Sequence, residues 1–119
     1  MNNQLQGIVI KVSNLEISRA FYRDTLQLGD PVMDSNFWVE FSLPCGSSLY
    51  LEKLDEKAAS SAVKSRISWV YKTDAKAMIE RLAEYDYNST TTRELRVGFE
   101  LVKFYDPEGN SFYIADNKS

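Results

Sequence analysis

The stretch FYDPEGNSFYIAD, residues 104–116, decides how the chain is interpreted, because it contains the pattern of a complete hairpin. Its centre, Asp106-Pro107-Glu108-Gly109-Asn110, has turn chemistry. Proline pre-sets φ, glycine supplies a positive φ, and Asp and Asn side chains bond back to their own backbone. We therefore expect a strand, a tight turn and a second strand that carries Tyr113.

The residues before this hairpin predict the rest of a module. Residues 66–72, RISWVYK, alternate as a strand does, and Thr73 or Asp74 can cap the helix that follows. Apolar residues then recur at helical spacing up to Ala83, and further strands are expected near 90–95 and 98–105. The order from about 66 to 116 is thus β-α-β-β-β.

The first half of the chain repeats this order. Residues 7–13, GIVIKVS, alternate as a strand, and Ser13-Asn14-Leu15-Glu16 matches a capping box that starts a helix running to about Leu26. Strands are expected at 31–34, 36–43 and 47–53, which gives a first module at about 7–54. Residues 55–64 are polar and small, which allows a linker or a short helix, and the linker is favoured. Aligning the halves matches Val12 with Tyr71 and Leu51 with Ile114.

Composition limits the class of protein. The chain has 119 residues, 44% of them hydrophobic, which is enough for one compact domain over residues 1–119. A net charge of −3 argues against a nucleic-acid partner, whose proteins usually carry a basic patch. The sequence shows no apolar run long enough to span a membrane and no signal-peptide pattern, and its one cysteine, Cys45, cannot form an internal disulfide. We expect a cytoplasmic protein.

The chain contains no histidine. This excludes histidine as a metal ligand, as a general base and as a member of a catalytic triad. Any catalysis would have to use carboxylates, lysine, tyrosine, Ser or Thr hydroxyls, or the single thiol.

Several motifs in this order resemble the glyoxalase/bleomycin-resistance/dioxygenase superfamily, also called the vicinal oxygen chelate superfamily. They are Val12–Ser18, Phe21-Tyr22, Leu26–Gly29 and Asp106–Asn110. The resemblance covers residues 7–116. It implies an α+β fold in which two βαβββ modules form a cupped eight-stranded mixed sheet with the helices outside. It also implies a homodimer and a small-molecule ligand bound in a cleft between the modules.

Enzymes of this superfamily hold a divalent metal with His or Glu ligands, at the start of each module's first strand and in its last strand. By motif, the resemblance carries these places to Gly7 and Tyr50 in module one and to Arg66 and Tyr113 in module two. Glycine has no side chain to offer, arginine has no lone pair, and tyrosine has a pKa near 10. A small register shift would bring in Glu52 alone. The sequence therefore predicts no metal and no cofactor.

The leading hypothesis is a metal-free small-molecule binding protein that sequesters a drug or another aromatic compound. Tyr50 and Tyr113 would form a matched pair that stacks on the ligand. The ligand-binding candidates are Gly7, Lys11, Trp38, Tyr50, Glu52, Arg66 and Tyr113.

Two other functions stay open from the sequence, and no catalytic residue is assigned. The first is a lyase, isomerase or dioxygenase-type enzyme with an atypical site, which would be either metal-dependent through carboxylates such as Glu52 and Glu100 or metal-free with a tyrosine acid. Glu40 and Glu100 are interpreted as occupying matching places in the two modules. The second is a scaffold domain that binds a protein partner.

Overall fold

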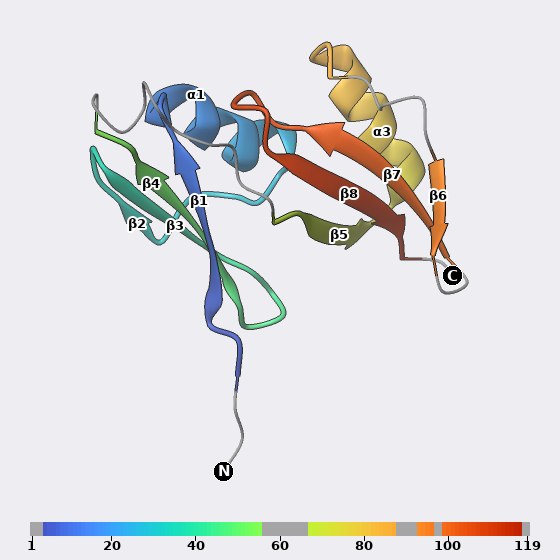
Figure 1. The fold of residues 1–119 in the computed structure, drawn as a ribbon, viewed down its shortest axis with the longest axis horizontal. Coiled ribbons are helices and arrows are strands. Elements are labelled where there is room, and N and C mark those ends of the chain that lie inside the picture. Colours follow the sequence, from blue (N-terminus) through green and yellow to red (C-terminus); the bar gives the residue numbers. More distant parts are fainter. Residues whose placement is uncertain (1–3, 56–66, 88–92, 97–98, 118–119) are drawn as a thin grey trace. The chain divides into compact units, whose positions relative to one another are not determined.

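The chain forms two units, residues Met1–Val63 and Lys64–Ser119, and each is a four-stranded sheet with one helix packed against it (Figure 1). This computed structural model describes residues 4–55, 67–87, 93–96 and 99–117. Most of the linker expected at 55–64 and the candidate Arg66 lie outside the described residues. The α+β class is confirmed, whereas the joining of the two sheets into one cupped sheet of eight strands stays a prediction.

Unit 1 has the strand order β1-β4-β3-β2. Strand β1 pairs in parallel with β4, and the other neighbours are antiparallel. The elements are β1 (Gly7–Val12), α1 (Leu15–Ala20) with its π-helical continuation η1 (Phe21–Thr25), β2 (Met33–Asp34), β3 (Trp38–Ser42) and β4 (Ser48–Lys53). The first module expected at about 7–54 thus has the predicted order of elements.

Unit 2 repeats the topology as β5-β8-β7-β6, again with a parallel pair between its first and last strands. Its elements are β5 (Trp69–Thr73), α3 (Ala75–Glu84), β6 (Arg93–Arg96), β7 (Phe99–Tyr105) and β8 (Ser111–Asp116). The expected hairpin is therefore confirmed. The two helices also begin and end close to the expected residues.

Asparagine and aspartate caps start the two helices. The Asn14 side chain accepts a hydrogen bond from the amide of Ile17, and the Asp74 side chain accepts one from the amide of Ala77. Each bond satisfies one of the orphan donors of the first helical turn. In unit 1 the cap is thus Asn14 rather than Ser13, so the capping-box interpretation was wrong by one residue.

The hairpin turn is held by Asp106, whose exposed fraction is 4%. Its Oδ1 accepts hydrogen bonds from the amides of Glu108 at 2.9 Å and Asn110 at 2.8 Å. Gly109 has a φ of 85°, the left-handed region that glycine enters without strain. These contacts close the turn and bring β7 and β8 into register.

Each unit buries one face of its sheet under its own helix. In unit 1 this face carries Ile10, Val12, Val39, Phe41, Leu49 and Leu51, all at most 3% exposed. In unit 2 it carries Trp69, Val102, Phe104, Phe112 and Ile114. The ring of Phe112 lies between two others, with its centroid 6.1 Å from that of Trp69 and 5.9 Å from that of Phe104. Because side chains alternate along a strand, the strand residues that lie between these positions are on the opposite, helix-free face.

Candidate functional site

The helix-free face of unit 1 brings together most of the predicted site residues. Strand register places Tyr50 beside Val9 of β1 and Glu40 of β3, and Glu52 beside Lys11 and Trp38. The face is made up of Gly7, Val9, Lys11, Trp38, Glu40, Ser42, Ser48, Tyr50 and Glu52. All five candidates predicted in this unit, namely Gly7, Lys11, Trp38, Tyr50 and Glu52, therefore share one surface.

Two aromatic rings form the apolar part of this surface. The ring centroids of Trp38 and Tyr50 are 5.1 Å apart, and the two ring planes are inclined by 39°. Both side chains are half-buried, so neither is sealed in the core. The Tyr50 hydroxyl also accepts a hydrogen bond from the Gln6 side chain at 3.3 Å. The two rings form an aromatic platform with a polar tip, which suits a planar molecule.

Gly7 lies under the edge of this platform. A Cβ at this position would lie 2.8 Å from Cε2 of Tyr50 and would also collide with the backbone carbonyl oxygen of Ser48. The space beside Gly7 is thus occupied by the Tyr50 ring. Gly7 acts in this surface by letting the ring approach the backbone rather than by leaving a cavity for a ligand.

Two carboxylates flank the rings. Glu40 is held in place because its Oε2 accepts a hydrogen bond from the buried Ser48 hydroxyl at 2.7 Å. Glu52 is half-buried beside Trp38 in the register. Lys11, which pairs with Glu52 in the strand register, is exposed. The described charged groups of this surface are therefore mainly acidic.

Unit 2 has its own helix-free face, and Tyr113 lies on it. Tyr113 pairs with Val70 of β5 on one side and with Lys103 of β7 on the other. The strand register places on this face Val70, Lys72, Glu94, Arg96, Phe99, Leu101, Lys103, Tyr105, Ser111, Tyr113 and Ala115. The position of Tyr113 away from the helix agrees with its predicted role.

The two tyrosines occupy equivalent places in their sheets. The amide of Leu54 bonds the carbonyl of Val12 in unit 1, and the amide of Asn117 bonds the carbonyl of Thr73 in unit 2. These two bonds close the same parallel strand pair in each unit. Val12 therefore corresponds to Thr73, and not to Tyr71 as the sequence alignment had it.

This correction moves one of the four places that the resemblance assigns to metal ligands. With Val12 matched to Thr73, the counterpart of Gly7 is Ser68 rather than Arg66, while Tyr50 still corresponds to Tyr113. The Ser68 hydroxyl shares a hydrogen bond with the hydroxyl of Ser111 on the neighbouring strand. The alignment was wrong by two residues, a shift that leaves the alternating pattern of a strand unchanged.

The predicted match between Glu40 and Glu100 was also wrong. Glu40 lies opposite Tyr50, and the residue opposite Tyr113 is Lys103. Glu100 alternates with Leu101 and so shares its side of the sheet with Val102 and Phe104, on the helix-covered face. Glu40 and Glu100 therefore lie on different faces of their sheets and do not form a matched pair of carboxylates.

The residues at the four places do not fit the superfamily's metal. Gly7 supplies no donor, Ser68 supplies a neutral hydroxyl, and Tyr50 and Tyr113 are phenols. Divalent transition metals in this kind of site are bound by imidazole, thiolate or carboxylate groups. Elsewhere in the described residues, no three Cys, Asp or Glu side chains are grouped closely enough to hold an ion.

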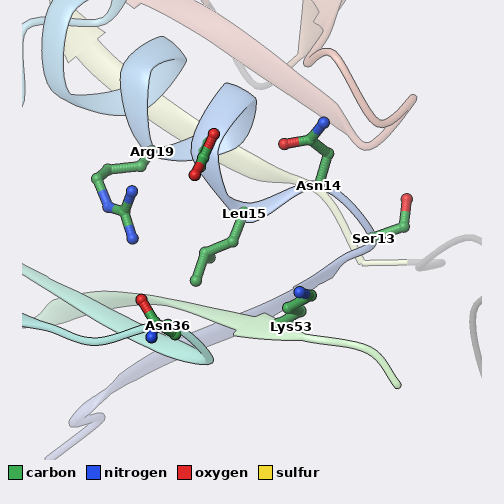
Figure 2. A pocket seen from close by; sticks show the side chains of 7 residues that line it. Ser13, Asn14, Leu15, Arg19, Asn36 and Lys53 are labelled. Atoms are coloured by element: carbon green, nitrogen blue, oxygen red, sulfur yellow. The ribbon is translucent and has the colours of Figure 1, made fainter. Parts of the chain in front are cut away.

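A separate polar pocket of about 480 Å³ lies in unit 1 on the helix side of the sheet (Figure 2). Its lining residues are Ser13, Asn14, Leu15, Glu16, Arg19, Asn36 and Lys53. Arg19 already binds Asp34, with Nε 2.8 Å from Oδ1, and donates a hydrogen bond to the carbonyl of Ser35. Because Arg19 serves the structure and none of the predicted candidates lines the pocket, the helix-free faces are the stronger candidate site.

Known structures share this fold. A lactoylglutathione lyase from Agrobacterium tumefaciens is 20% identical, with a TM-score of 0.73 over 99% of this chain and 96% of that one. A glyoxalase-related enzyme from Fulvimarina pelagi is 18% identical, with a TM-score of 0.74 over 98% and 89%. TnmS3, an antibiotic binding protein from Streptomyces sp. CB03234, is 20% identical, with a TM-score of 0.74 over 97% and 96%. The sequence matches no protein-family model and no curated protein.

No helix in the described part of the chain has the length and apolar character to cross a bilayer.

Proposed function

We propose that this chain, which has the fold of the glyoxalase and bleomycin resistance proteins, is a metal-free protein that binds a small aromatic molecule on the helix-free faces of its sheets. The observation that carries the proposal is the matched pair Tyr50 and Tyr113. Each stands at the same register place of its sheet, on the side away from the helix. Each therefore replaces a metal donor with a ring.

The neighbourhoods of the two rings support contact rather than chelation. Tyr50 packs beside Trp38, and Tyr113 has the Nζ of Lys103 5.8 Å from its ring centroid. An ammonium at this place would repel a divalent cation, since like charges a few ångströms apart interact unfavourably. Aromatic rings, in contrast, add about 0.5–1.5 kcal/mol per stacked pair beyond the area they bury. The antibiotic-binding relative of the same fold is consistent with such a function.

The test is a stability screen of the purified chain against planar aromatic compounds, run beside Zn²⁺, Ni²⁺, Mn²⁺ and Fe²⁺. A compound at one hundred times its Kd adds about 2.7 kcal/mol to the free energy of unfolding. We expect such a shift with aromatic compounds and none with the metals. Tyr113→Ala should lose the ligand-dependent shift while keeping the circular dichroism spectrum of the native fold. Calorimetry that finds one tightly bound metal per chain would overturn the proposal.

An enzyme with an atypical site is the second candidate. It is favoured by the carboxylates of Glu40 and Glu52, which lie beside the Trp38 and Tyr50 rings where a bound molecule would rest. A carboxylate at such a place can act as a general base. Mass spectrometry of a bound compound after long incubation distinguishes an enzyme from a binding protein, because a binding protein releases the compound chemically unchanged. Glu40→Gln and Glu52→Gln should then leave the compound's affinity measurable and abolish any turnover.

The proposal includes a cytoplasmic homodimer. Hydrophobic side chains beside the strands of unit 1 are left in contact with solvent within a single chain, including Val32 at 65% and Phe37 at 67% exposed. Exposed apolar residues of this kind mark surfaces where a second chain can pack. Light scattering at micromolar concentration should give twice the mass of the chain. A monomer would refute this part and leave ligand binding as a separate question.

A further inference from the structure

Lys103 lies between two tyrosine rings on the helix-free face of unit 2. Its Nζ is 5.6 Å from the ring centroid of Tyr105 and 5.8 Å from that of Tyr113. Strand register explains the arrangement, because Lys103 pairs directly with Tyr113 and Tyr105 follows two residues later on the same side of β7. Ammonium groups within about 6 Å of an aromatic centroid are attracted by the electrons of the ring. The lysine is thus held over the surface that carries the two rings.

Among the side chains that the structure describes, this ammonium has no acidic partner. Its interactions in the structure are the contacts with the rings of Tyr105 and Tyr113. Among the residues whose side chains the structure describes, the other charged group on this face is Lys72, which is exposed. The strand register also places Glu94 and Arg96 of β6 on this face, so its residues include three cations and one carboxylate. This face therefore presents a positive charge beside aromatic surface, although the whole chain has a net charge of −3.

Unit 1 shows that the positive charge is not a requirement of the fold. The residue at the matching place is Glu40, opposite Tyr50, and its carboxylate is fixed by the Ser48 hydroxyl at 2.7 Å. The two units thus share strand order, register and tyrosine but have opposite charges at one equivalent position. A difference of this kind on otherwise matched surfaces points to ligand chemistry rather than to folding.

We infer that the helix-free face of unit 2 is selective for a planar aromatic molecule that carries an acidic group, such as a carboxylate. The acidic group accepts a charge-assisted hydrogen bond from Lys103, and the rings of Tyr105 and Tyr113 contact the aromatic part. Tyr105 is 44% exposed and Val70 is 52% exposed, so the face has accessible apolar area for the ring of a ligand. This inference rests on the proposed function and adds the charge of the ligand to it.

The test compares 2-naphthoate with 2-naphthamide, which has the same rings and no charge at neutral pH. Calorimetry on the full chain should show at least tenfold tighter binding of the acid. Lys103→Met keeps the length of the side chain and removes its charge, so this variant should bind both compounds equally. Lys72→Met removes a charge from the same face but from a side chain without ring contacts, and it should keep the preference. The preference should also shrink as salt screens the lysine.

The outcomes separate this inference from the proposed function. If both compounds bind equally to the native chain and both are lost in Tyr113→Ala, aromatic binding stands and the charge selectivity is refuted. Equal losses in Lys103→Met and Lys72→Met would show a general effect of net charge and would also refute it. Absence of binding by either compound at millimolar concentration overturns the aromatic-acid site. Light scattering that finds a dimer for the native chain and a monomer for Lys103→Met would also overturn it. The helix-free face of unit 2 would then be a contact surface for a second copy of the chain.

Discussion

Replacing Gly7 with alanine tests whether the aromatic platform of unit 1 depends on a bare backbone. The added Cβ would lie 2.8 Å from Cε2 of Tyr50 and closer still to the carbonyl oxygen of Ser48. The Tyr50 ring can move away by rotating. The Ser48 carbonyl cannot move cheaply, because β4 is hydrogen-bonded to β1 on one side and to β3 on the other.

The magnitude follows from two opposing terms. Forcing a methyl group into a packed site costs about 1–3 kcal/mol. Replacing glycine with alanine recovers about 0.4–1 kcal/mol, because the unfolded chain becomes less flexible. We therefore expect a net loss of about 1–2 kcal/mol in the free energy of unfolding. For a chain of this size that corresponds to a fall in Tm of about 4–8 °C.

Thermal and urea unfolding followed by circular dichroism would measure the loss. The control is the double variant Gly7→Ala with Tyr50→Ala, which removes the ring and keeps the collision with Ser48. Tyr50→Ala alone gives the cost of removing the ring. In the Tyr50→Ala background, Gly7→Ala should still cost more than half as much free energy of unfolding as it does in the native chain. A Tm for Gly7→Ala equal to or above that of the native chain would show that the strands adjust, and the argument for a required glycine would be wrong.

Three further predictions concern unit 2. Phe112→Ala should cost about 3–5 kcal/mol in urea unfolding, because the ring is fully buried between Trp69 and Phe104. Asp106→Ala should cost about 1–3 kcal/mol, because it leaves buried turn amides without their acceptor, and Asp106→Asn should cost less. Burial raises the pKa of Tyr71 above its usual value near 10, so the folded state keeps this proton while the unfolded state releases it. Stability should then fall above about pH 10 by at most about 1.4 kcal/mol per pH unit, and Tyr71→Phe should show a shallower fall.

The order of elements could be predicted from the sequence, because local chemistry determines it. The turn residues around Asp106 and the cap at Asp74 act over a few positions, and the structure uses them as expected. Tyr50 and Tyr113 were also matched correctly from motif spacing. The helix-free face of unit 1 followed from alternation alone, since Ile10 and Val12 had to turn inward and Lys11 outward.

What the sequence could not determine was the register between distant strands. Side chains alternate with a period of two, so a slip of two residues preserves every inward and outward assignment. Matching Val12 with Tyr71 instead of Thr73 therefore looked equally good, and it placed Arg66 where the backbone bonds place Ser68. For a related reason, alternation alone does not identify Lys103 as a candidate, because an isolated lysine in an alternating strand resembles an ordinary exposed residue.

One sequence signal could have identified Lys103. It precedes Tyr113 by the same ten residues that separate Glu40 from Tyr50, so equal hairpin lengths place both charged residues opposite a tyrosine. This equivalence strengthens the case against a metal at these places. The metal chemistry of the superfamily needs donors with available lone pairs, and this chain offers two phenols, a serine, a glycine and a nearby ammonium. Restoring one donor by Tyr113→Glu would still leave the Lys103 charge beside it, and the new carboxylate would pair with the ammonium before it met a metal ion.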